Sequence, residues 1–147
     1  MPTRVQRKGF DKERDLVLKF WEAGLAAIRG PASGARAKRI VYPDVVAMYR
    51  GSILVLEVKY RAKRETIYVE GEKIERLREF ARRAGGRVMI AVKYAGEEWR
   101  FIDPSSCPVT DGGRLRIDPE LVDKGLTLRE VIGLMKGQKS ITEYLGS

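Results

Sequence analysis

The sequence contains no histidine and only a single cysteine, Cys107. Without histidine, Ser-His-Asp and Cys-His catalysis, imidazole acid–base chemistry and the usual zinc sites are excluded. A lone cysteine excludes an internal disulfide and a cysteine-cluster zinc site, and it fits a reducing compartment. Any catalysis must therefore use carboxylates, lysine or a hard metal ion bound by oxygen atoms.

Long apolar runs are also missing. No stretch approaches the ~20 apolar residues of a membrane span, and the basic residues 1–10 are not followed by the apolar segment of a secretory signal. We therefore expect a soluble cytoplasmic protein, associated with the nucleoid. At 147 residues the chain is long enough for one domain with its own core.

The net charge of +9 is unevenly distributed along the chain. Residues 1–64 contain fifteen Lys or Arg and six Asp or Glu, whereas residues 65–147 contain fourteen of each kind. The whole positive excess thus lies in the part that carries Asp44, Glu57 and Lys59. A positive field around a small acidic site suits a polyanion that is bound broadly and attacked locally.

Two acids and a lysine interrupt an apolar hairpin near the middle of the chain. If Arg50-Gly51 forms a two-residue turn, Tyr49 pairs with Ser52, and Asp44 then lies opposite Glu57. Two residues beyond Glu57, Lys59 lies on the same face of the sheet. This prediction depends on the register, because a shift of one residue would separate the two acids.

Facing acids destabilise a sheet unless a cation lies between them. Asp44 and Glu57 would serve as hard oxygen ligands for Mg²⁺, with the backbone carbonyl of Val58 as a third ligand. Lys59 would orient or deprotonate the attacking water, or stabilise the anionic transition state. The alternative for any one of these residues is an ordinary cross-strand ion pair at a strand end.

A helix is predicted from Asp11, its expected N-cap, to a stop at Gly24. Leu16 and Phe20 recur at helical spacing inside it, and Glu13 precedes them by three and seven residues. Glu13 is therefore expected on the inward face, where it would reach the metal through water. The alternative is that Glu13 only interacts with the helix dipole.

The remaining pattern predicts a single domain over residues 1–136 and a tail over residues 137–147. Strands are expected at residues 25–29, 66–69, 88–94 and 99–102, helices at residues 72–84 and 127–134, and loops between residues 104 and 119.

A loop of small residues, 30–35, and several cations are candidates for contacts with phosphate. Small residues let a backbone approach a ligand closely, and cations hold phosphates by charge rather than by base recognition. An ordinary solvated loop is the alternative for residues 30–35. The predicted DNA-binding residues are Arg7, Lys8, Ser33, Arg36, Lys38, Arg39, Arg61 and Lys63.

A helix acid, then Pro-Asp, then Glu-x-Lys at the end of a buried strand resembles the PD-(D/E)xK nuclease superfamily. Further segments resemble the archaeal Holliday junction resolvase family (Hjc and Hje type), and this similarity spans residues 4 to about 134. The segments are Arg7-Lys8-Gly9 with Glu13-Arg14, Pro31-Ala32-Ser33-Gly34, Tyr68-Val69, Phe80-Ala81-Arg82 with Gly85-Gly86, and Gly125-Leu126.

The resemblance implies a restriction-endonuclease-like α/β fold, in which helices flank a central mixed β-sheet. It also implies a homodimer that acts in DNA recombination and repair. Such an enzyme makes paired nicks in a four-way DNA junction by phosphodiester hydrolysis that depends on Mg²⁺, with Mn²⁺ as a substitute.

The resemblance also assigns roles to single residues. The metal-binding acids of the family map onto Asp44 and Glu57, the helix acid onto Glu13, the lysine onto Lys59 and the loop serine onto Ser33. One departure concerns the helix after the hairpin. This chain has Lys73 where the family has a glutamine, and Lys73 is not assigned to the predicted site.

The C-terminal residues 138–145 resemble the peptide that binds the sliding clamp (PCNA). Such a peptide anchors in a hydrophobic pocket through its apolar side chains. The predicted clamp-binding residues are Gln138, Ile141, Tyr144 and Leu145. An unstructured tail or one packed in the dimer is the alternative.

Three functions thus remain open, of which a junction-resolving endonuclease is favoured. The second is a PD-(D/E)xK nuclease that acts on another branched or duplex DNA. The third is a basic nucleic-acid-binding protein without catalysis.

Overall fold

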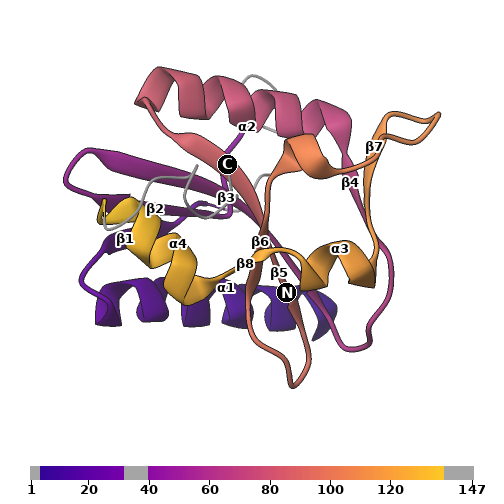
Figure 1. The fold of residues 1–147 in the computed structure, drawn as a ribbon, viewed down its shortest axis with the longest axis horizontal. Coiled ribbons are helices and arrows are strands. Elements are labelled where there is room, and N and C mark those ends of the chain that lie inside the picture. Colours follow the sequence, from indigo (N-terminus) through magenta and orange to yellow (C-terminus); the bar gives the residue numbers. More distant parts are fainter. Residues whose placement is uncertain (1–3, 32–39, 138–147) are drawn as a thin grey trace.

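A six-stranded mixed sheet forms the centre of the molecule, and helices cover both of its faces (Figure 1). The computed structural model describes residues 4–31 and 40–137. β3 and β5 run parallel, and the other neighbours in the sheet are antiparallel. The strands lie in the order β1 (Ala26–Arg29), β2 (Val45–Tyr49), β3 (Ser52–Arg61), β5 (Arg87–Tyr94), β6 (Arg100–Ile102) and β8 (Leu126–Thr127).

The helices divide the core into two clusters, one on each face of the sheet. The helix α2 (Gly71–Ala84) packs on one face, whereas α1 (Arg4–Glu22) and α4 (Leu128–Met135) pack on the other, as Figure 1 shows. The α2 side also carries the small sheet of β4 (Ile67–Glu70) and β7 (Arg114–Ile117), the 3-10 helix η1 (Pro104–Ser106) and α3 (Pro119–Asp123). No helix in the described part is long and apolar enough to cross a membrane.

The alternation of side chains along β3 decides which cluster each residue joins. Leu54 and Leu56 pack in the cluster under α1, whereas Val55 packs in the cluster under α2. Because successive side chains of a strand point to opposite faces, Glu57 and Lys59 follow Val55 onto the α2 face. Glu57 is 2% exposed and is the one buried charged side chain among the described residues.

The hairpin of β2 and β3 has the turn and register that its sequence predicts. Tyr49 pairs with Ser52, and the ladder continues to the pair of Val45 and Leu56. Arg50 has a φ of 44° and Gly51 a φ of 88°, which are the two positive values that a type I′ turn requires. The register on which the site depends is therefore confirmed.

The first helix begins earlier than predicted. It starts at Arg4, so Asp11 lies inside the helix and pairs with Arg14 at 3.2 Å instead of capping the first turn. An aspartate three residues before an arginine is favourable inside a helix, and an aspartate is also favourable as an N-cap. The local sequence therefore does not decide between these two positions for Asp11. The predicted stop is confirmed, because Gly24 has a φ of 91° and the helix ends at Glu22.

The segment predicted as loops, residues 104–119, contains η1 and β7 and ends at the start of α3. β7 alternates exposed arginines with buried Leu115 and Ile117 and pairs with β4, while α3 begins at Pro119. A strand of four residues with a partner far away in the chain gives little local signal. The last helix agrees with the prediction, since Thr127 caps α4 in a reciprocal pair with Glu130.

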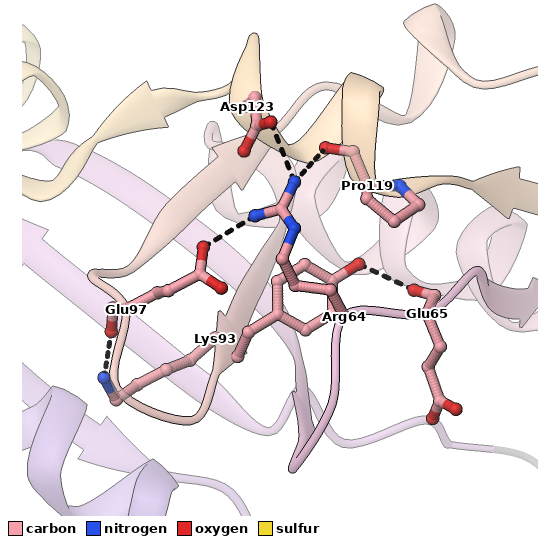
Figure 2. A network of polar contacts seen from close by, with 7 residues as sticks. Arg64, Glu65, Lys93, Glu97, Pro119 and Asp123 are labelled. Carbon is pink, nitrogen blue, oxygen red and sulfur yellow. Dashed lines mark hydrogen bonds and ion pairs between the residues drawn. The ribbon is translucent and has the colours of Figure 1, made fainter.

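A network around Arg64 fixes the basic loop between β3 and β4 (Figure 2). The Arg64 guanidinium contacts Glu97, in the turn between β5 and β6, at 2.6 Å and Asp123 of α3 at 2.8 Å. It also lies over the ring of Tyr94, whose hydroxyl donates to the carbonyl oxygen of Glu65 at 2.6 Å. Arg64 therefore holds the loop to two distant segments and is engaged in the fold.

Candidate active site

The backbone of β3 holds Asp44 in place at the start of the hairpin. Its Oδ2 accepts a hydrogen bond from the N–H of Val58 at 2.8 Å. Its own N–H donates to the carbonyl oxygen of Leu56 at 3.0 Å. Asp44 thus lies next to Glu57 at the point where the ladder of β2 and β3 ends.

Glu57 is buried on the α2 face and is met there by a lysine from the first turn of α2. The Nζ of Lys73 lies 3.0 Å from Oε1 and 2.9 Å from Oε2 of Glu57. Only the contact with Oε1 has the angles of a hydrogen bond, and Oε2 is buried without a hydrogen-bond partner. Lys73, which was not assigned to the predicted site, therefore contacts one of its acids.

Glu13 approaches the same place from α1. Its Oε1 lies 3.6 Å from Nε of Arg29, the last residue of β1, and its side chain is 13% exposed. Arg29 pairs with Val45 across the ladder of β1 and β2, so it is adjacent to Asp44. The inward direction predicted for Glu13 is confirmed, whereas Arg29 was missed.

The two acids that flank Asp44 hold their protons unusually tightly. Burial, followed by repulsion from Asp44, raises the pKa of Glu57 to about 7 against the lowering effect of Lys73 and Lys59. The pKa of Glu13 is also raised to about 7, first by burial and then by Asp44, while Arg29 and Lys73 lower it. Burial and the charge of Asp44 thus oppose ionisation of both acids more strongly than the neighbouring cations favour it.

The metal-free protein is expected to lose stability as the pH rises from about 4.5 to about 7. Because the pKa of Glu57 is higher in the folded state than its ordinary 4.5, the folded state binds this proton more tightly. The contribution to stability is fully present below pH 4.5 and is lost as the pH rises through about 7. The difference between the two pKa values corresponds to about 3 kcal/mol for Glu57.

Urea unfolding at pH 5 and at pH 8 in the presence of a chelator measures this change. Glu57→Gln should reduce the difference between the two pH values, because the amide does not titrate. A difference as large in Glu57→Gln as in the parent protein would contradict the assignment of this proton to Glu57.

A glycine lets the two parts of the site approach each other. A Cβ atom on Gly30, directly after β1, would lie 1.8 Å from the carbonyl oxygen of Pro43. The N–H of Gly30 donates to the carbonyl oxygen of Asp44 at 2.9 Å. For residues 30–35, the sequence left contact with a ligand and an ordinary solvated loop as alternatives, and the close contact of Gly30 is with the Pro43-Asp44 backbone.

The other predicted residues divide into two groups. Arg61 contacts Glu65 at 3.3 Å, and Lys63 is exposed in the loop after β3. For Arg7 and Lys8, the structure describes the backbone but not the side chains. The other predicted residues lie outside the described part of the chain: Ser33, Arg36, Lys38, Arg39, Gln138, Ile141, Tyr144 and Leu145.

The donor set fits a divalent cation, although the side chains hold other partners in this arrangement. Within residues 4–31 and 40–137, no three acids stand together as a complete metal site. Glu57 contacts Lys73, Glu13 contacts Arg29, and Asp44 binds a backbone N–H. Two features would be relieved by a bound cation: the raised pKa values of Glu13 and Glu57, and the buried Oε2 of Glu57, which is ion-paired with Lys73 but accepts no hydrogen bond.

Comparison with known proteins identifies the family. A family model described as archaeal Holliday junction resolvase (Hjc) matches residues 4–140. The chain belongs to this family. It is 38% identical over 135 residues to the crossover junction endodeoxyribonuclease Hjc of Sulfurisphaera tokodaii, which covers 92% of each chain. It is 35% identical to Hjc of Sulfolobus acidocaldarius, over 92% of this chain and 93% of the relative.

A solved structure of the Hjc family has the same fold. The Holliday junction resolvase Hjc of Archaeoglobus fulgidus superimposes with a TM-score of 0.77 at 34% identity, over 85% of this chain and all of the other. The resemblance inferred from the motifs is therefore confirmed. The predicted restriction-endonuclease-like architecture, a mixed sheet flanked by helices, is confirmed as well.

Proposed function

We propose that this chain resolves four-way DNA junctions by metal-dependent hydrolysis of phosphodiester bonds at the site around Asp44 and Glu57. As a member of the Hjc family, it is a crossover junction endodeoxyribonuclease. The observation that carries the proposed site is the buried Glu57, which lies beside Asp44 on the sheet face of Lys59. Buried acids next to a lysine in a basic chain suit attack on a phosphodiester.

Asp44 and Glu57 would hold Mg²⁺ directly, with the carbonyl of Val58 as a further ligand and Glu13 acting through water. Mn²⁺ has the same preference for oxygen ligands and should substitute. A divalent ion held by these residues would supply a water of lowered pKa and would neutralise charge on the phosphoryl oxygens. Lys59 orients the attacking water and stabilises the negative charge that develops on the phosphate. The hydrogen bond from Val58 keeps Asp44 in position for this work.

The basic residues would position the junction through its phosphates. Arg61 is the last residue of β3, Lys63 follows it in the next loop, and the Arg64 network keeps this loop in place. We propose contacts with DNA phosphates also for Ser33 and the cations of residues 36–39, and for Arg7 and Lys8. These contacts recognise the shape and charge of the DNA, not its base sequence.

A four-way junction has two equivalent strands to cut, which suits a homodimer with one site in each protomer. We expect sedimentation to give the mass of a dimer, and both nicks to arise within a single encounter with the junction.

Cleavage of labelled DNA tests the proposal. A panel of four-way junction, flap and linear duplex, each with Mg²⁺, with Mn²⁺ and with a chelator, should give paired nicks in the junction only when metal is present. Equal cleavage of flaps or duplex would favour a nuclease for another DNA structure. Junction binding without any metal-dependent nicking would favour a binding protein and overturn the proposal.

The C-terminal tail would connect the enzyme to a sliding clamp. The residues Gln138, Ile141, Tyr144 and Leu145 have the spacing of a clamp-binding peptide. Calorimetry with the purified clamp should give micromolar binding that Tyr144→Ala weakens at least tenfold, without loss of junction cleavage. Equal affinity of the parent and the Tyr144→Ala variant would contradict this role.

A further inference from the structure

Lys73 contacts Glu57, the one buried charged side chain among the described residues. Its Nζ lies within 3.0 Å of both carboxylate oxygens of Glu57, which is 2% exposed. The lysine side chain is 35% exposed, so part of it is in contact with solvent. A buried carboxylate needs a compensating charge, and in this arrangement Lys73 supplies it.

The charges of the site balance without any added ion. Its three acids and three cations have formal charges that cancel. They are Glu13, Asp44, Glu57, Arg29, Lys59 and Lys73. A neutral side chain in place of Lys73 would leave a net negative charge for a divalent cation to neutralise. With Lys73 present, an ion that binds Glu57 meets an ammonium already in contact with the same oxygens.

We propose that Lys73 is the resident cation of this site: it neutralises Glu57 in the metal-free protein and competes with the divalent ion for that carboxylate. This inference rests on the proposed metal site at Asp44 and Glu57. It makes Lys73 a positioning residue that sets how tightly the ion is held.

The structure allows Lys73 to give way. The side chain has a flexible stem, starts in the first turn of α2 and is 35% exposed. If a divalent ion bound Glu57, the ammonium of Lys73 would turn outward. This movement would leave the packing of α2 intact, because the buried residues of α2 are Ile74, Leu77 and Ala81. Metal binding would therefore exchange one cation for another at Glu57.

Calorimetric titration of the full chain with Mn²⁺ at pH 8, in the absence of DNA, tests the competition. Lys73→Gln should bind Mn²⁺ about tenfold more tightly than the parent protein, because the opposing charge is removed. Lys73→Arg keeps the charge and should stay within about threefold of the parent. Without metal, Lys73→Gln should melt several degrees lower, since Glu57 then lacks its partner.

Arg76→Gln is the matched control, because it removes a positive charge from the same helix at an exposed pair with Glu72. It should change neither the Mn²⁺ affinity nor the melting temperature appreciably. If Lys73→Gln does not fold, Lys73→Met, which keeps an apolar stem, gives the same comparison.

The outcomes separate this inference from the proposed function. Equal or weaker Mn²⁺ binding by Lys73→Gln, with binding by the parent that Asp44→Asn abolishes, would overturn the role of Lys73 alone. Absence of Mn²⁺ binding in both the parent and Lys73→Gln would overturn the metal site itself, and this inference with it.

Discussion

Asp44→Asn is expected to lower the rate of junction cleavage roughly a thousandfold while junction binding is retained. The amide has nearly the shape of the carboxylate and can still accept the hydrogen bond from Val58. The amide lacks the negative charge that holds a divalent ion, so the variant should be slowed in the chemical step of cleavage. Single-turnover cleavage with Mg²⁺ and gel-shift binding with a chelator measure the two quantities separately.

Glu57→Gln should behave in the same way, and both variants should bind the junction as tightly as the parent or more tightly. Removal of an acid reduces repulsion of the DNA phosphates. Asp111→Asn and Glu120→Gln are suitable controls, because both acids are exposed and lie far along the chain from the hairpin. Cleavage by Asp44→Asn or Glu57→Gln within tenfold of the parent would exclude these acids as the metal ligands.

Gly30→Ala should destabilise the protein by about 3 kcal/mol and reduce cleavage at the same time. The added Cβ would meet the carbonyl oxygen of Pro43 at 1.8 Å, and neither partner is a flexible side chain. Either β1 or the Pro43-Asp44 backbone must move. Movement of that backbone displaces the carboxylate of Asp44, which accounts for the expected loss of cleavage.

Thermal unfolding and junction cleavage on the same preparation test this prediction. The melting temperature should fall by roughly 10 °C. Gly112→Ala provides the matched control, since the nearest atom to its Cβ would lie at 3.9 Å. A Gly30→Ala variant with the stability and activity of the Gly112→Ala protein would mean that the close approach of Gly30 does not position the site.

Much of the hairpin and its acids follows from local sequence. A two-residue turn at Arg50-Gly51 fixes every pair of β2 and β3 by counting, because strand pairing leaves no freedom once the turn is set. The burial of Glu57 also follows, since it alternates in phase with Val55. These features depend on residues close together in the chain, which is why they could be predicted.

The first helix shows where local signals mislead. Asp11 has the chemistry of an N-cap, yet the helix continues through it to Arg4. β7 was missed for a different reason, because its partner β4 is distant in the sequence and a short strand has almost no signal of its own. Neither error affected the prediction that Asp44 and Glu57 lie close together.

The sequence by itself determined which chemistry is available and how Asp44 and Glu57 are paired in register. Without histidine and with a single cysteine, only carboxylates, lysine and a hard metal ion remained. Only the tertiary structure decided which cations meet these acids. Lys73 reaches Glu57 because α2 packs on that face of β3, and Arg29 reaches Glu13 because β1 pairs with β2 beneath α1. These contacts join segments that are far apart in the chain. They form only when the helices and strands have packed together, so the residues next to each charged group in the sequence do not predict them.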